Sequence, residues 1–200
     1  MRSVSESRNS SATAVFILGM HRSGTSAITQ AVKVLGFELS DNLMPAKPDN
    51  VKGFWEDWDV VNLNERILRS DTGSWDRLSL FDQNMHSPEE LEQLISETTQ
   101  LLQRKFDGVT RFAIKDPRIS LILPLWREAC TRQLIEPVYI LCLRHPFSIA
   151  SSLASRNEMP EKKALLLWLN HVYSIFRDCH APLLVVGYES ILSDPHKELR

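Results

Sequence analysis

The chain has 200 residues, of which 43% are hydrophobic and 24% are charged, and its formal net charge is -2. This length suits a single α/β domain, and the balance of charges lacks the cationic excess of proteins that bind nucleic acid. We therefore expect no nucleic-acid partner, and any anion site must be a local one. The three cysteines, Cys130, Cys142 and Cys179, fit neither a disulfide framework nor paired metal ligands.

The first residues are polar and rich in serine, without the apolar stretch that a secretory signal or a membrane anchor requires. We expect a disordered leader over residues 1–12, no membrane anchor and a cytoplasmic location. No internal repeat or linker divides the remaining sequence, so we expect one domain over residues 13–200.

Four short apolar runs, at residues 14–18, 111–114, 137–143 and 183–186, have the length of β-strands. Their apolar residues do not alternate with polar ones, which is typical of strands that are covered on both faces. The stretches between them are long enough for crossover helices. The sequence therefore predicts an α/β fold of three layers, with a central parallel sheet flanked by helices.

Helices are expected at residues 25–35, 59–68, 87–106 and 160–178. The third opens with a serine, a proline and two acidic residues, which is typical of a helix start. In the fourth, apolar residues at helical spacing predict a face buried in the core. These residues are Leu165, Leu169, Val172 and Phe176. Residues 40–55 have few periodic apolar residues, so an irregular loop is expected there.

A glycine-rich turn follows the first predicted strand, where residues 19–26 read Gly-Met-His-Arg-Ser-Gly-Thr-Ser. Glycines let the backbone curl around an anion, and the dipole of the following helix adds about half a positive charge at that end. The pattern is typical of a phosphate-binding turn in a P-loop-like fold. The residues expected to bind the anion are Gly19, His21, Arg22, Ser23, Gly24, Thr25 and Ser26.

The turn departs from the mononucleotide P-loop, which has a lysine where this chain has Thr25. The basic group instead stands at Arg22, from which it can reach a bridging oxygen or the transferred group of a bound anion. An ordinary strand-to-helix turn with an exposed arginine is one alternative interpretation. A divergent nucleotide-dependent kinase, with Asp116 as its magnesium carboxylate, is another, and Thr25 argues against it.

The turn resembles the 5′-phosphosulfate loop of the sulfotransferase superfamily that uses 3′-phosphoadenosine 5′-phosphosulfate (PAPS), including the bacterial and carbohydrate branches with arginine in place of lysine. A second motif of that family is matched where Arg144 ends the third predicted strand and Ser152 follows eight residues later. The resemblance implies that Arg144 and Ser152 bind the 3′-phosphate of the donor. An arginine at a strand end offers several donors to a phosphate, and Pro146 suits the start of a helix.

Weaker similarities extend the resemblance across most of the chain. Lys115 resembles the strand-end lysine that approaches the donor, and Tyr188 belongs to a segment that resembles a structural element of the family. The chain departs from the family at Pro117, where cytosolic relatives have a catalytic histidine, and at Ala27, where many have a tryptophan that stacks on adenine. The glycine-rich segment that closes over the 3′-phosphate is absent, so we expect the domain to lack its C-terminal segment.

The resemblance implies transfer of a sulfuryl group from PAPS to an acceptor hydroxyl or amine, with no metal required. Arg22 and Lys115 are expected to stabilise charge on the departing phosphate of adenosine 3′,5′-bisphosphate. Glu56, beside aromatic residues, is our predicted general base, and an ordinary first-turn acid of the next helix is the equal alternative. A noncatalytic nucleotide-binding module is the alternative of a different class. The class of the acceptor and the oligomeric state stay open.

Overall fold

The computed structural model describes residues 11–46, 53–71 and 73–193. At its centre is a parallel sheet of four strands in the order β2-β1-β3-β4. The strands are β1 (Thr13–Leu18), β2 (Arg111–Lys115), β3 (Glu136–Leu143) and β4 (Leu183–Gly187). All four predicted strands are confirmed, with ends that differ from the prediction by one residue at most.

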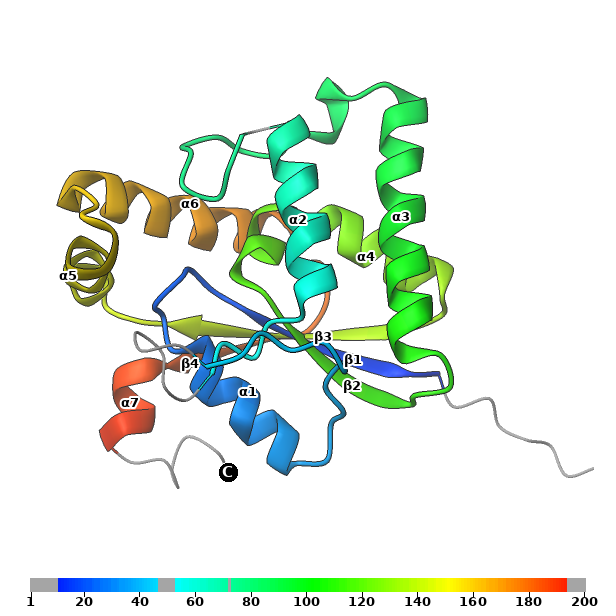
Figure 1. The fold of residues 1–200 in the computed structure, drawn as a ribbon, viewed down its shortest axis with the longest axis horizontal. Coiled ribbons are helices and arrows are strands. Elements are labelled where there is room, and N and C mark those ends of the chain that lie inside the picture. Colours follow the sequence, from blue (N-terminus) through cyan, green and yellow to red (C-terminus); the bar gives the residue numbers. More distant parts are fainter. Residues whose placement is uncertain (1–10, 47–52, 72, 194–200) are drawn as a thin grey trace, which may run out of the picture.

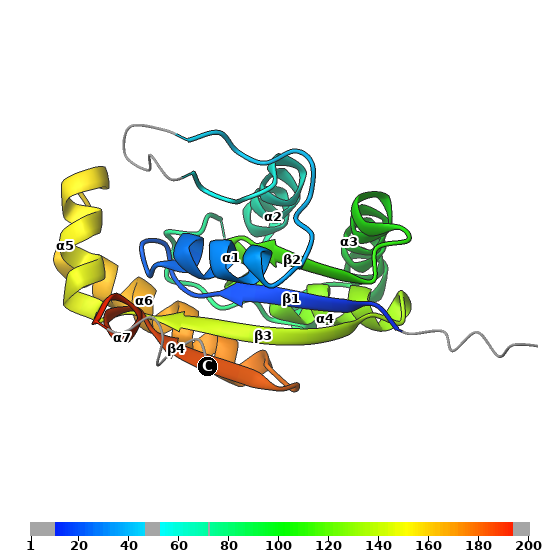
Figure 2. The same ribbon diagram turned by 90° about the horizontal axis from the view of Figure 1, so that it is seen from below.

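Helices cover both faces of this sheet, as Figure 1 and the turned view in Figure 2 show. On one face lie α1 (Thr25–Val34) and α7 (Tyr188–Ser193). On the other lie α2 (Trp58–Ser70), α3 (Pro88–Phe106), α4 (Leu123–Arg132) and α6 (Glu161–Asp178). The helix α5 (Pro146–Asn157) packs on α6, and two short 3-10 helices span Gln83–Met85 and Pro117–Leu121. The predicted three-layer α/β fold is therefore confirmed.

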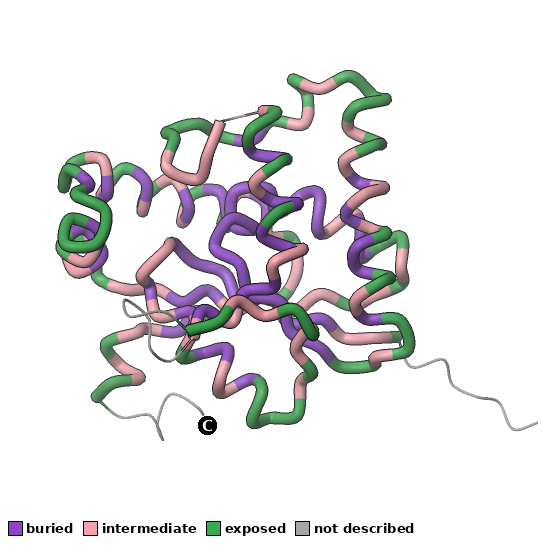
Figure 3. The backbone as a smooth tube through the Cα atoms, viewed as in Figure 1, coloured by how far each residue is buried: buried purple, intermediate pink, exposed green. Residues whose placement is uncertain are grey.

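The larger hydrophobic core lies between the sheet and α2, α3, α4 and α6. Its aromatic residues pack together: the ring centroids of Phe16 and Trp126 are 6.0 Å apart, and those of Phe16 and Tyr139 are 5.6 Å apart. A smaller apolar cluster fills the space between the sheet and α1. The buried residues in Figure 3 accordingly follow the central strands. Because both faces are covered, these strands have nearly continuous apolar sequences.

Side-chain caps fix where two of the helices begin. Ser87 and Glu90 form a reciprocal capping box at the start of α3, with N–O distances of 3.2 and 2.9 Å, as the sequence predicts. At the start of α2, the carboxylate of Asp57 accepts hydrogen bonds from the backbone N–H groups of Asp59 and Val60. The second cap also fixes the backbone next to Glu56.

The predicted core face of α6 is wrong for Leu169 and Phe176, whereas Leu165 is half-buried and packs against an apolar cluster. Leu169 and Phe176 are 54% and 58% exposed, and the residues that face the core are instead Ala164, Leu167, His171 and Ile175. Apolar residues stand at helical spacing on two faces of this helix. Periodicity shows which residues share a face, but it does not show which of two such faces turns inward.

The predicted leader over residues 1–12 falls almost wholly outside the described residues, which begin at residue 11. Within the described ranges, no helix is long and apolar enough to cross a membrane. The cysteines carry free thiols, and those of Cys130 and Cys142 are buried.

Candidate functional site

The glycine-rich turn connects the end of β1 to the start of α1. Gly19 and Gly24 have φ angles of 138° and 96°, which lie in the region that favours glycine. A Cβ atom at Gly19 would stand 2.7 Å from the carbonyl oxygen of Cys142, and one at Gly24 would overlap the ring of Tyr188. Both glycines are therefore required by their backbone angles and by close neighbours. The turn ends on the N-terminal N–H groups of α1, which suit an anion.

Contacts from distant parts of the chain hold this turn. The N–H of Gly19 donates to the hydroxyl of Ser120 at 3.1 Å, and the thiol of Cys142 donates to the carbonyl oxygen of Ser23 at 3.0 Å. Burial raises the pKa of the Cys142 thiol to about 12, so the sulfur keeps its proton and remains a donor. The turn is thus fixed by β3 and by the 3-10 helix after β2, and not only by its own sequence.

The two predicted anion-binding motifs meet at this turn. The Nε of Arg22 donates to the hydroxyl of Ser152 at 2.9 Å, and an Nη of Arg144 donates to the carbonyl oxygen of Arg22 at 2.8 Å. The Arg144 guanidinium lies 4.8 Å from the ring centroid of Tyr188. The hydroxyl of Ser23 and the Nε of Arg144 are buried and have no hydrogen-bond partner among the described residues. Buried polar atoms of this kind are rare, and a bound anion would supply the missing partner.

A cavity of about 570 Å³ opens beside the turn, within the usual size range of small-molecule sites. The predicted site residues in its wall are His21, Arg22, Gly24, Thr25, Ser26, Glu56, Lys115 and Arg144. Gly19, Ser23 and Ser152 are outside the wall. Of these, Gly19 and Ser23 shape the turn, and Ser152 is connected to the cavity through Arg22.

Lys115 and Glu56 form a buried ion pair in this wall. The Nζ of Lys115 lies 2.5 Å from Oε1 of Glu56 and donates to the carbonyl oxygen of Phe54 at 2.9 Å. The other oxygen of Glu56 is 3.6 Å from Arg118. Both carboxylate oxygens of Glu56 therefore face cations. Its role as general base stays a prediction.

Arg118 was not foreseen as a site residue, although it stands three residues after Lys115. It lines the cavity and pairs with Asp116 and Glu65 at 2.9 and 3.1 Å. The second oxygen of Asp116 accepts from Asn64 at 2.9 Å. Asp116 is fully buried, and its oxygens are occupied by these partners, which argues against the magnesium carboxylate of the kinase interpretation.

His21 projects from the turn into a group of aromatic rings. Its ring centroid lies 4.2 Å from that of Trp75 and 6.3 Å from that of His171. Its Nε2 is closed off from solvent and has no hydrogen-bond partner within the described ranges. Burial, followed by the nearby charge of Arg118, holds the pKa of His21 well below its usual value. Trp75 belongs to an irregular segment, and no local pattern in the sequence could have placed it here.

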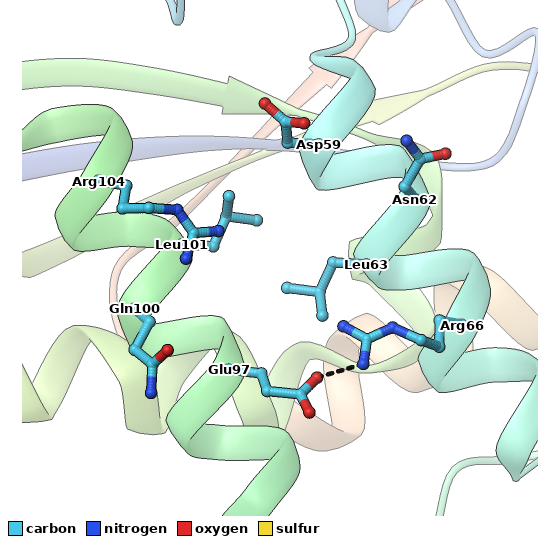
Figure 4. A pocket seen from close by; sticks show the side chains of 8 residues that line it. All are labelled: Asp59, Asn62, Leu63, Arg66, Glu97, Gln100, Leu101 and Arg104. Carbon is cyan, nitrogen blue, oxygen red and sulfur yellow. Dashed lines mark ion pairs between the residues drawn. The ribbon is translucent and has the colours of Figure 1, made fainter.

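A smaller cavity of about 260 Å³ lies between α2 and α3 (Figure 4). Its wall is polar and includes the ion pair between Arg66 and Glu97, whose N–O distance is 2.5 Å. None of the predicted site residues lines it. The cavity beside the glycine-rich turn is therefore the candidate site.

No protein-family profile matches this chain, and no relative was found among curated proteins. The sulfotransferase domain of the olefin synthase from Synechococcus PCC 7002 superposes with a TM-score of 0.53 at 20% identity, covering 99% of this chain and 74% of that one. A sulfotransferase domain from the curacin biosynthetic pathway has a TM-score of 0.53 at 15% identity, covering 94% and 71%. A proposed kinase from Chloroflexus aurantiacus J-10-fl has a TM-score of 0.46 at 13% identity, covering 90% of this chain and 86% of that one. The chain thus has the fold of sulfotransferase domains, which confirms the resemblance at the level of the fold.

Proposed function

We propose that this chain moves a sulfuryl group from PAPS to a hydroxyl or amine of an acceptor. The observation that carries the proposal is the meeting of two anion-binding motifs at one cavity, where Arg22 contacts Ser152 and Arg144 contacts the Arg22 carbonyl. A simple phosphate-binding turn needs only the first motif. A donor with a second phosphate at its 3′ position gives the second motif a ligand of its own.

The unpaired polar atoms support this placement of the donor. The hydroxyl of Ser23 lies in the turn, where the 5′-phosphosulfate would bind, and the Nε of Arg144 lies where the 3′-phosphate would bind. Charge-assisted hydrogen bonds to phosphate are among the strongest that arginine makes. The ring of Tyr188 lines the same cavity and packs against the guanidinium of Arg144.

In the proposed reaction the acceptor oxygen or nitrogen forms a bond to sulfur while the bond from sulfur to the 5′-phosphate breaks. The electron pair of the broken bond stays on the phosphate, where charge grows. Arg22 in the turn and Lys115, which lines the same cavity, would stabilise that charge. Lys115 would exchange its contact with Glu56 for one with the donor, which would also release Glu56.

The test is a comparison of ligands followed by a transfer assay. Calorimetry should show strong binding of adenosine 3′,5′-bisphosphate and weak binding of ATP with magnesium. Labelled PAPS is then incubated with glycan, lipid, peptide and phenol acceptors, and label should appear in at least one class. Preference for ATP with magnesium would overturn the proposal in favour of a kinase. Binding of the bisphosphate without transfer to any acceptor would favour a noncatalytic module.

A further inference from the structure

The cavity contains few groups that can take a proton from an acceptor. Pro117 lines the wall, and its side chain cannot act as a base. Glu56 faces the same cavity but is held by Lys115 and Arg118. His21 is the histidine in this wall, and it extends from the turn that would hold the sulfuryl group.

The surroundings of His21 keep its ring neutral. The charged or titratable groups that face it are Arg118, His171, Lys115 and Arg156, which come from four different elements. Burial against Trp75 and the positive charges of Arg118, Lys115 and Arg156 disfavour the imidazolium, and the pKa of His21 is lowered accordingly. A neutral imidazole carries one unprotonated nitrogen, which can accept a proton.

We propose that His21 is a catalytic residue that accepts the proton of the acceptor during sulfuryl transfer, an inference that rests on the proposed function. The O–H or N–H bond of the acceptor breaks, and its proton moves to the unprotonated ring nitrogen of His21. The acceptor atom bonds to sulfur, and the 5′-phosphate leaves with the electron pair of the old bond.

Binding of the donor should raise the pKa of His21 toward the working pH. Without a ligand, an imidazolium at His21 would be repelled by Arg118 and Lys115. The phosphosulfate brings negative charge to the turn and compensates these cations, so the pKa of His21 rises when the donor binds. A general base works best when its pKa approaches the working pH, so the site becomes active as the donor enters.

The first test measures this pKa directly and needs no turnover. Histidine resonances of the wild-type protein are titrated by NMR with and without adenosine 3′,5′-bisphosphate, and the His21 signal is assigned from its loss in His21→Gln. The midpoint of His21 should rise by about one pH unit or more in the complex. An unchanged midpoint at saturating ligand overturns the role of His21. Failure of the bisphosphate to bind overturns the proposed function itself, and this role with it.

The second test compares His21→Gln with Glu56→Gln in the transfer assay, with His180→Gln as the control because His180 is exposed. His21→Gln should lose roughly 10² to 10⁴-fold in kcat, keep its affinity for the bisphosphate, and lose the acidic limb of the pH–rate profile. Added imidazole should restore part of the activity of His21→Ala. Normal turnover in His21→Gln, or an equal loss of bisphosphate affinity, contradicts the inference. If Glu56→Gln loses the acidic limb of the pH–rate profile and His21→Gln keeps it, the base is Glu56 and not His21.

Discussion

The Nε of Arg22 donates a 2.9 Å hydrogen bond to the hydroxyl of Ser152, although the two residues are 130 positions apart in the sequence. Arg22 follows β1 and Ser152 lies in α5, which follows β3. β1 and β3 are neighbouring parallel strands, and β2 lies on the other side of β1. The strand order therefore reverses at this point: after β1 the chain continues to β2 on one side, and then returns to β3 on the other side. Ligands of open α/β sheets bind at such a point, and here it brings the two predicted anion-binding groups together.

Ser152→Ala should weaken binding of adenosine 3′,5′-bisphosphate by about 2 kcal/mol and leave binding of adenosine 5′-phosphate unchanged, because only the first ligand has a 3′-phosphate. Calorimetry with both nucleotides checks this. Ser151→Ala is the matched control, because Ser151 is an exposed neighbour on the same helix. Arg144→Ala should weaken the binding of both nucleotides, since Arg144 also donates a hydrogen bond to the carbonyl oxygen of Arg22. Equal losses for both ligands in Ser152→Ala would show that Ser152 acts only on the turn.

Arg22→Ala should reduce turnover by roughly 10²-fold or more, because in the proposed reaction this cation stabilises the charge that develops on the leaving phosphate. The folded state should persist, since the Arg22 side chain is only half-buried. The turnover of Arg22→Lys should lie between that of the wild-type protein and that of Arg22→Ala, because lysine keeps the charge but lacks the planar set of donors. Turnover with labelled PAPS and thermal unfolding are measured for all three proteins. Near-normal turnover in Arg22→Ala would remove Arg22 from the mechanism.

Gly24→Ala should destabilise the protein more than Gly36→Ala, by about 1–3 kcal/mol in the free energy of unfolding. Both glycines have positive φ angles, of 96° and 86°, so both substitutions carry backbone strain. Only the new methyl group at Gly24 would overlap the Tyr188 ring, whereas the space beside Gly36 is open. Urea unfolding gives the two free energies. Adding Tyr188→Ala should recover part of the loss in Gly24→Ala, and equal losses at the two glycines would contradict the contact.

The stability of the protein should fall on acidification because His171 is fully buried. Burial lowers the pKa of His171 to about 4, from a value of 6.5 in the unfolded chain. Between these two values the unfolded state binds the extra proton, so stability falls as the pH falls through this window and does not change above it. The loss at His171 should reach roughly 3 kcal/mol.

Urea unfolding across this pH range measures that loss in the wild-type protein and in two variants. His171→Leu removes the titrating group from the same buried position, and should reduce the dependence on pH. His180→Gln replaces an exposed histidine and should keep the wild-type slope. An unchanged slope in His171→Leu would show that other groups, with His21 the first candidate, cause the acid sensitivity.

The elements that could be predicted from the sequence are those whose signals are local. The strands are short apolar runs, the start of α3 is a capping box at Ser87, and the turn is marked by Gly19 and Gly24. The inward face of α6 was mistaken, because Leu169 and Leu167 both belong to apolar series and only the neighbouring elements decide between them. The helix α4 was not predicted at all, since its apolar start carries no polar side-chain cap.

The predicted site residues were found from motifs, but the contacts between them are set by the packing of the whole chain. Lys115 and Glu56 are 59 positions apart, and no spacing rule connects them. The same holds for Trp75, which reaches His21 from an irregular segment. Sequence motifs indicated which side chains to expect around an anion. They did not predict which carboxylate would form an ion pair with each cation in the absence of a ligand.

The strand order also determines when the candidate site can form during folding. β1 is synthesised first, yet its pairing partners begin at Arg111 and Glu136. The groups that hold the turn, from Ser120 and Cys142, belong to the same later half of the chain. Folding slows as contacts become more distant in sequence, because long loops must close before those contacts form. A nascent chain that ends before β3 therefore carries the complete turn sequence but no binding site, and anion affinity should arise late in synthesis, in one step.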